Sequence, residues 1–254
     1  MKIHFLGTGT SQGIPIIGST DPVCLSDNLK DKRLRTSVWV HWDDVDVVID
    51  CGPDFRQQML ASQCPKIDAL LFTHEHADHT AGLDDIRPFV YKQGALPVYG
   101  HKRVLDNLAK RFDYIFSDEN KYPGAPSVKP FLVDPSASFV CTGKEIVPIT
   151  VTHYGLSVLG YRFGAFAYIT DMFSIAPKEE AKLKNLDVLV VNALRIEPHP
   201  SHLHLDAAID FAQRVGAKCT YFTHISHKLG FHEEVEKALP KGIHLAYDNL
   251  TISI

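Results

Sequence analysis

The sequence predicts an α+β fold in which two halves, each with strands followed by helices, pack as one sandwich. Apolar runs of strand length recur along the 254 residues, and segments with helical spacing lie between them. No low-complexity segment or sharp change in composition divides the chain. We therefore expect one domain over residues 1–254, with a core large enough to need no disulfide or metal for its stability.

The first half alternates short apolar runs with polar turns. A glycine-rich turn follows the first strand, and the polar pair Asp43-Asp44 separates two strands that we expect to form a hairpin. Residues 114–135 are rich in proline and aromatic side chains, and we expect them to form a long binding loop or lid. The expected strands are residues 3–6, 37–40, 45–49, 67–72 and 97–99, and the expected helices are 55–63 and 103–112.

The second half repeats this alternation. Residues 159–163 and 166–170 are expected to pair as a hairpin, and residues 205–215 have the spacing of an amphipathic helix, with Gly216 suited to its C-terminal cap. The other expected strands are residues 145–152, 187–191 and 219–223, and the other expected helices are 177–183 and 232–239.

Composition narrows the class of protein. The net charge of −4 argues against a large nucleic-acid interface, which is usually basic. No apolar run approaches the roughly 20 residues of a membrane helix, and the start of the chain lacks the apolar stretch of a signal peptide. The five scattered cysteines suit reduced thiols better than a disulfide framework, so we expect a cytoplasmic protein.

Four residues of metal-ligating type lie within six positions: His74, His76, Asp78 and His79. They follow the apolar run of residues 67–72, which indicates a buried strand. Imidazoles and a carboxylate at the end of a strand are unfavourable in a core, but they suit metal binding. The alternative is a surface loop that binds metal adventitiously, and the spacing and the strand context favour a dedicated site.

Three more residues of this type follow apolar runs later in the chain: His153, Asp171 and His224. Taken singly, each also fits a hydrogen-bonded histidine or a turn aspartate. Seven ligands at strand ends are too many for one tetrahedral zinc ion, so we expect two divalent ions that share a bridging carboxylate and support hydrolysis. Zinc or manganese would suit this donor set, with iron and nickel as alternatives.

The pattern His-x-His-x-Asp-His at residues 74–79 resembles the signature of the metallo-β-lactamase superfamily, and the resemblance covers essentially the whole chain. Other segments resemble the ribonuclease Z and phosphodiesterase branches and, more narrowly, the PhnP-type phosphodiesterases, which cleave cyclic phosphodiesters. The resemblance implies a four-layer αββα sandwich with a two-metal site at one edge of the sheets. The segments are FLGTGTS (5–11), GIP (13–15), RLRTS (33–37), VIDCGPDFR (48–56), DDIRP (84–88) and THISH (223–227).

The resemblance also implies a role for each ligand and a hydroxide between the ions that attacks phosphorus in line. It implies that the leaving oxygen is protonated by His202, in a loop ahead of a helix, with His204 or a purely exposed loop histidine as alternatives. We expect His202 and Asp78 to be the catalytic residues. The implied ligands are His74, His76 and His153 for one ion, Asp78, His79 and His224 for the other, and Asp171 as the bridge.

Residues other than the seven ligands are expected to support the metal site or to form a second one. Asp50 ends a strand and is expected to accept a proton from a ligand imidazole, unless it is an ordinary turn aspartate. PhnP-type proteins also hold a structural zinc through three cysteines and a later histidine, and Ser19 and Asp21 stand at two of those cysteine positions here. Two alternatives stay open here: a weakened metal site of Asp21, Cys24 and His227, or a hydrogen-bonded cluster without metal.

Together these features predict a metal-dependent phosphodiesterase that acts on small phosphodiesters, cyclic ones included. A ribonuclease Z-type endonuclease is the first rival, but the chain has no basic, Gly-rich arm between Asp171 and His224. A thioester or lactone hydrolase is the second rival. A non-enzymatic binding module is the third, and the seven ligands argue against it. We expect a small-molecule phosphodiester as partner, neither a membrane nor nucleic acid, and we leave a homodimer open.

Overall fold

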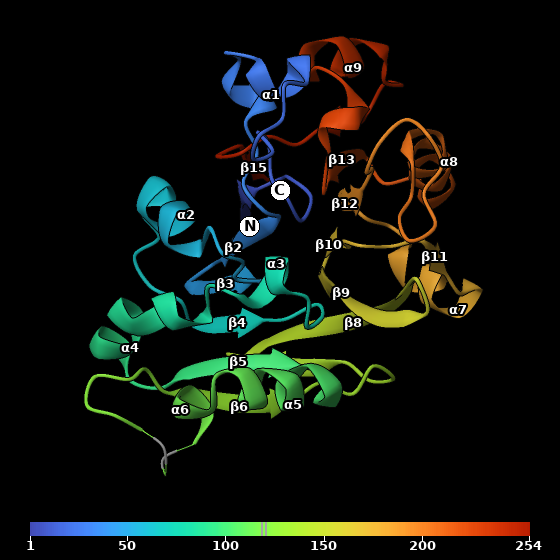
Figure 1. Ribbon diagram of the computed structural model, residues 1–254. Coiled ribbons are helices and arrows are strands. Elements are labelled where there is room, and N and C mark those ends of the chain that lie inside the picture. Colours follow the sequence, from blue (N-terminus) through green and yellow to red (C-terminus); the bar gives the residue numbers. More distant parts are fainter. Residues whose placement is uncertain (118, 120) are drawn as a thin grey trace.

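The computed structural model describes residues 1–117, 119 and 121–254. Two β-sheets face each other, and helices cover their outer faces (Figure 1). Over the described residues, the first sheet has seven strands. In spatial order they are β15 (Thr251–Ser253), β1 (Lys2–Gly7), β2 (Ser37–Trp42), β3 (Val45–Ile49), β4 (Ala69–Leu71), β5 (Leu96–Gly100) and β6 (Val128–Leu132).

The second sheet is built from the later part of the chain. Its strands, in spatial order, are β11 (Ser174–Ile175), β8 (Lys144–His153), β9 (Leu156–Phe163), β10 (Phe166–Tyr168), β12 (Val188–Asn192), β13 (Cys219–Thr223) and β14 (Ile243–Leu245). One further short strand, β7 (Phe139–Cys141), pairs with β8. Neighbours in each sheet combine hairpins, such as β8–β9, with parallel pairs, such as β12–β13.

The helices are mostly short. They are α1 (Pro22–Leu25), α2 (Phe55–Ser62), α3 (Ala77–Thr80), α4 (Arg87–Gln93), α5 (Lys102–Arg111), α6 (Asp113–Phe116), α7 (Pro177–Glu180), α8 (Leu205–Val215) and α9 (His232–Ala238), with 3-10 turns at η1 (Leu29–Asp31), η2 (Leu83–Ile86), η3 (Ala181–Leu183) and η4 (His227–Leu229). No helix in the described part of the chain is both long and apolar enough to span a membrane.

Strand alternation explains the four layers. Successive side chains of a strand point to opposite faces, so a strand covered on both faces is apolar throughout. In β3, Val47 packs in the core between the sheets, whereas Val48 packs with Phe55 of α2. In β12, Val190 lies in the central core, and Leu189 joins the cluster that includes residues of α8. These three apolar layers confirm the α+β class and the αββα sandwich.

Most expected elements are present. The sequence did not predict the edge strands β6, β11, β14 and β15, nor the short helices α3 and α4. The helix at 205–215 and its left-handed cap at Gly216 are confirmed. The expectation of a long loop over residues 114–135 was wrong, because it contains α6 and β6; residues 118 and 120 of this stretch lie outside the described residues. β6 pairs parallel with β5 and forms the edge of the sheet. Proline has no backbone N–H to donate, and Pro130 is tolerated on this edge strand because no further strand needs that donor.

Candidate metal centre

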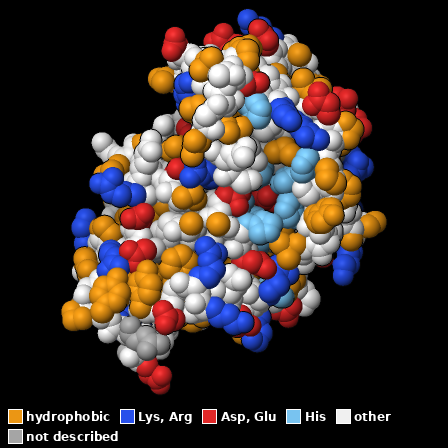
Figure 2. All heavy atoms as spheres, in the orientation of Figure 1, with side chains coloured by type: hydrophobic (Ala, Val, Ile, Leu, Met, Phe, Trp, Pro, Cys, Tyr) orange, Lys and Arg blue, Asp and Glu red, His pale blue; other side chains and the backbone are white. Residues whose placement is uncertain are grey.

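The seven expected ligands come from the ends of strands in both sheets. His74 and His76 follow β4, Asp78 and His79 lie in α3, and His153 ends β8. Asp171 follows β10, and His224 follows β13. Figure 2 shows histidine and acidic side chains gathered at the middle of the face that Figure 1 turns to the viewer.

Three residues near this edge adopt a left-handed backbone. The φ angles of Asp50, Asp171 and His224 are 63°, 56° and 55°. Each residue follows a strand, so the chain turns sharply there and exposes the side chain at the sheet edge. Such conformations are uncommon outside glycine and cluster at functional sites, where the surrounding structure maintains them.

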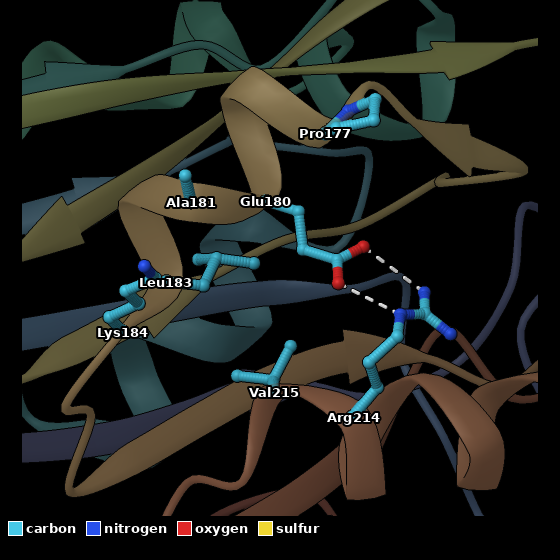
Figure 3. Close-up of a pocket in the computed structure, with 7 residues that line it drawn as sticks. All are labelled: Pro177, Glu180, Ala181, Leu183, Lys184, Arg214 and Val215. Carbon is cyan, nitrogen blue, oxygen red and sulfur yellow. Dashed lines mark hydrogen bonds and ion pairs between the residues drawn. The ribbon is translucent and has the colours of Figure 1, made fainter.

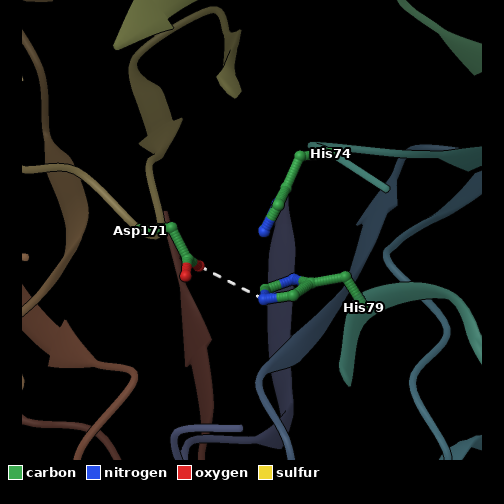
Figure 4. Close-up of side chains that lie close together, drawn as sticks. All are labelled: His74, His79 and Asp171. Atoms are coloured by element: carbon green, nitrogen blue, oxygen red, sulfur yellow. Dashed lines mark ion pairs between the residues drawn. The ribbon is translucent and has the colours of Figure 1, made fainter. Parts of the chain in front are cut away.

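Asp171 lies at the centre of the cluster. Its Oδ2 is 3.2 Å from His79 Nε2, and its Oδ1 is 3.2 Å from His224 Nε2. Asp78 Oδ2 lies 3.3 Å from the same His79 nitrogen. Figure 4 shows Asp171, His74 and His79 pointing toward one another from different elements. In that set and in the set Asp78, His79 and His224, the ligand atoms lie within 4.8 Å of one another.

Several buried nitrogen atoms of the cluster have no hydrogen-bond partner. They include Nε2 of His79 and both ring nitrogens of His224, even though carboxylate oxygens lie near the Nε2 atoms. A buried polar atom without a partner is costly, and a few such atoms converging on one point are unusual. Imidazole nitrogens and carboxylate oxygens arranged in this way fit divalent metal ions.

The hydrogen bonds around the cluster fix which histidine nitrogen is free. Asp50 Oδ2 lies 2.7 Å from His79 Nδ1 and also accepts from the Thr73 hydroxyl at 2.8 Å. A carboxylate can only accept, so His79 carries its proton on Nδ1 and leaves Nε2 bare. Because the Thr73 hydroxyl donates to Asp50, it accepts from His74 Nδ1 at 3.0 Å, so Nε2 of His74 carries no proton and faces His76 Nδ1 at 3.0 Å. The expected hydrogen bond from Asp50 to a histidine of the motif is present, at His79.

His153 is oriented in the same way by a backbone group. Its Nδ1 donates to the carbonyl oxygen of Ser201 at 2.9 Å, since a carbonyl can only accept. The Nε2 atom of His153 is therefore also free. His79 and His153 thus have one nitrogen held by the protein and the other available to a ligand, whereas Nε2 of His74 faces His76 Nδ1.

The electrostatics of the cluster favour a cation. Burial lowers the pKa of His74 well below its usual value, which keeps this ring neutral and able to bind a metal ion. Burial also tends to lower the pKa of His79, but the carboxylates of Asp171 and Asp78, with Asp50, outweigh it and raise this pKa well above its usual value. The negative charge that raises the pKa of His79 would equally stabilise a metal ion beside its Nε2 atom.

Comparison with protein families decides the affiliation. The model of the β-lactamase superfamily domain matches residues 46–225, a segment that contains all seven expected ligands. The chain belongs to the metallo-β-lactamase superfamily.

Several known proteins are similar to this chain over different shares of their lengths. The crystal structure of a new diphosphatase from the PhnP family has 40% sequence identity and a TM-score of 0.92, covering 100% of this chain and 97% of that chain. An octanoyltransferase of Porphyromonas gingivalis is 40% identical over 98% of this chain and 51% of that protein. Ribonuclease Z of Bacillus licheniformis is 30% identical over 64% of this chain and 48% of that protein. The chain therefore spans about half the length of these two relatives.

Among the described residues, His202 belongs to a closely spaced set of ligand atoms at the metal centre, and His204 does not. The Nε2 atom of His202 is 3.0 Å from Asp171 Oδ1, and its Nδ1 is 2.9 Å from the Ser201 hydroxyl. Burial lowers the pKa of His202 to about 4, against the opposing effect of Asp171. His202, His153 and Asp171 also form a third set of closely spaced ligand atoms. His204 is the N-cap residue of α8, without a side-chain capping bond.

The second metal site that the sequence left open is not assembled. Asp21 caps α1 by accepting from Val23 N at 2.9 Å, and Cys24 Sγ accepts from Ile16 N at 3.5 Å. Among the described residues, Asp21, Cys24 and His227 are not a set of converging ligand atoms. Asp21 therefore serves as the N-cap of α1 in this structure.

Sequence reasoning missed the residues that hold the histidine motif in place. Arg103 of α5 binds both carboxylate oxygens of Glu75, at 2.8 and 3.1 Å, and also donates to the Ser157 carbonyl of β9. Arg111 donates to the Glu75 carbonyl and to the Thr80 hydroxyl. Both arginines lie in a helix with ordinary amphipathic spacing, so the only local signal was the acidic residue within the motif.

A cleft of about 410 Å³ adjoins the cluster. It is lined by His76, His153, Tyr154, Leu156, Pro200 and Ser201. Another cleft, of about 610 Å³, lies between α7 and α8 (Figure 3). There Glu180 and Arg214 pair with each other, and none of the cluster residues lines it, so of these two clefts only the first adjoins the candidate ligands.

Proposed function

We propose that the protein is a metal-dependent hydrolase that cleaves a P–O bond in small phosphodiesters. The observation that carries the proposal is the Asp171 carboxylate, which lies among imidazoles from both sheets and shares closely spaced sets with His74 and with His153. The similarity to a PhnP-family diphosphatase supports this substrate class, because each phosphorus of a disubstituted diphosphate, like that of a phosphodiester, carries two bridging oxygens and one negative charge.

We further propose the division of ligands between two divalent ions, zinc or manganese. Asp171 would bridge them, since its two oxygens face different imidazoles. The unpaired nitrogens of His79 and His224 support metal binding without choosing the metal. The first ion would bind His74, His76 and His153, and the second would bind Asp78, His79 and His224.

When bound, such a pair of ions supplies a nucleophile from water at neutral pH and neutralises the charge on the phosphoryl oxygens. The protein would contribute orientation and a proton. Asp50 and Thr73 would keep the Nε2 atoms of His79 and His74 unprotonated. Asp78 would take part in the reaction as a ligand of the second ion. His202 would donate its proton to the leaving oxygen, because the negative charge of a bound phosphoryl group raises the pKa of a neighbouring imidazole.

Turnover of a phosphodiester panel tests the proposal. The protein, freed of metal and reloaded with zinc or manganese, should hydrolyse bis(p-nitrophenyl) phosphate, cyclic ribose phosphates or disubstituted diphosphates. A chelator should abolish this turnover, and re-addition of metal should restore it. The proposal fails if the metal-loaded protein hydrolyses none of these, and a wholly inactive protein would favour the binding-module alternative.

A second candidate is an ester or thioester hydrolase with an acyl substrate. The similarity to the octanoyltransferase of Porphyromonas gingivalis favours it, as does the apolar lining from Leu156 and Pro200 beside the cluster. Hydrolysis of p-nitrophenyl octanoate or an octanoyl thioester, faster than that of any phosphodiester, would select this candidate.

The ribonuclease Z alternative has less support. The segment between Asp171 and His224, all of it described, consists of β11, α7, η3, β12, α8, β13 and their connections, without a protruding arm. Together with the net charge of −4, this argues against transfer RNA as substrate. We also propose a cytoplasmic location, which the five free cysteines support.

A further inference from the structure

The hairpin between β8 and β9 has an unusual residue at its tip. His153 pairs with Leu156, so Tyr154 and Gly155 form a two-residue turn with φ angles of 44° and 81°. Turns with positive φ at both central residues favour asparagine or glycine at the first position. A bulky aromatic residue in this conformation is strained, and such strain is typical of functional positions.

The strained turn places Tyr154 beside the metal centre. Tyr154 directly follows His153, and its side chain lines the 410 Å³ cleft although the residue is 76% exposed. A large aromatic side chain that stays this exposed is not held by core packing. The conformation of the turn therefore serves to present the ring at the mouth of the cleft.

We propose that Tyr154 determines specificity by stacking on a flat ring of the substrate, of the size of a nucleobase. This inference rests on the proposed function and adds the class of substituent that the phosphodiester carries. The bound ring would lie in the cleft between Tyr154 and Pro200, with its phosphoryl group toward His76 and His153.

The lining of the cleft favours a flat ring over the alternatives. No Lys, Arg, Asp or Glu lines it, so a sugar or a charged substituent would find few polar partners. Its apolar surface comes from a tyrosine, a leucine and a proline, which suit the faces of a planar ring. Base–aromatic stacking is tolerant of base identity, and removing the aromatic side chain costs roughly 5- to 150-fold in affinity.

The chain provides a matched control on the same strand. At the other end of β8, Cys141 pairs with Lys144, and Thr142-Gly143 form a turn with φ angles of 50° and 81°. A strand of this length is roughly 30 Å long, so Thr142 is remote from the metal centre. Asparagine at either position should relieve the same backbone strain, but only Tyr154→Asn removes the ring.

Equilibrium binding to the metal-loaded protein tests the proposal, with adenosine 5′-monophosphate and ribose 5-phosphate as probes. Tyr154→Ala should weaken binding of the nucleotide about 10-fold and leave binding of the sugar phosphate unchanged, and Tyr154→Phe should bind both like wild type. Tyr154→Asn and Thr142→Asn should each raise the melting temperature by about 2 °C, yet only the first should weaken nucleotide binding.

Equal effects of Tyr154→Ala on both probes, or no effect on either, would overturn the proposal. Selective loss of p-nitrophenyl octanoate hydrolysis in this variant would assign the cleft to an acyl chain instead, which also overturns it. The proposed function is judged separately by wild-type turnover of phosphodiesters. An active enzyme whose nucleotide affinity does not depend on Tyr154 refutes this inference alone.

Discussion

The substitution Asp50→Asn tests whether the hydrogen bond to His79 controls metal binding. Asp50 is completely buried, and its Oδ2 faces two donors, His79 Nδ1 and the Thr73 hydroxyl. If the side-chain carbonyl of the asparagine accepts from the Thr73 backbone N–H, as Oδ1 of Asp50 does, its NH₂ group faces both His79 Nδ1 and the Thr73 hydroxyl. The hydroxyl can rotate to accept, but His79 can accept only by moving its proton to Nε2, the nitrogen that a metal ion needs.

The size of the effect follows from this one hydrogen bond. Restoring the binding tautomer in the variant breaks the neutral hydrogen bond from the introduced asparagine to His79 and leaves a buried N–H group without an acceptor, which costs about 1–3 kcal/mol. That free energy corresponds to a loss of about 5- to 150-fold in metal affinity. Competition with a chromophoric chelator at equilibrium measures this loss directly, without reference to any substrate.

The control is Asp46→Asn, four positions earlier along the same strand. Asp46 is also buried and lies 2.7 Å from a histidine nitrogen, His41 Nδ1, while it accepts from Trp39 Nε1 at 2.8 Å. It should lose stability without losing metal affinity. If Asp50→Asn binds metal as tightly as wild type, or if Asp46→Asn weakens binding equally, the control of His79 by Asp50 is refuted.

Three further predictions concern other parts of the chain. Asp171→Ala should lose both ions, because a bridging carboxylate serves each, and full metal content by elemental analysis would contradict the bridge. His202→Ala should retain metal and lose ~10²–10⁴-fold in turnover of alkyl phosphodiesters but much less for nitrophenyl esters, since p-nitrophenolate leaves without a proton; loss of metal would instead make His202 a ligand. Burial and the neighbouring Arg33 lower the pKa of His232 to about 4. Its stabilising contribution is therefore complete above pH 6.5 and is lost as pH falls toward 4. Between pH 7 and pH 4, the free energy of unfolding measured with urea should fall by up to about 3 kcal/mol more in the wild type than in His232→Gln. Equal pH dependence of the two proteins would contradict this.

The sequence by itself determined the features that depend on neighbours along the chain. Alternating apolar runs predicted the strands that are buried on both faces, such as β3 and β12, because burial on both sides requires a continuous apolar run. Helical spacing and Gly216 predicted α8 to its last residue. The ligand-type residues were visible because they lie just beyond apolar runs, four of them within the six positions 74–79.

Only the tertiary structure decided what depends on partners far apart in sequence. β15 exists because it pairs with β1, at the opposite end of the chain, and β6 exists because it adds to the edge of β5. The free nitrogens of the histidines depend on Asp50, Thr73 and the Ser201 carbonyl, which no local pattern connects with the motif. Propensity and periodicity act over a few residues, whereas hydrogen-bond geometry and backbone strain at a site arise only when both sheets are in place.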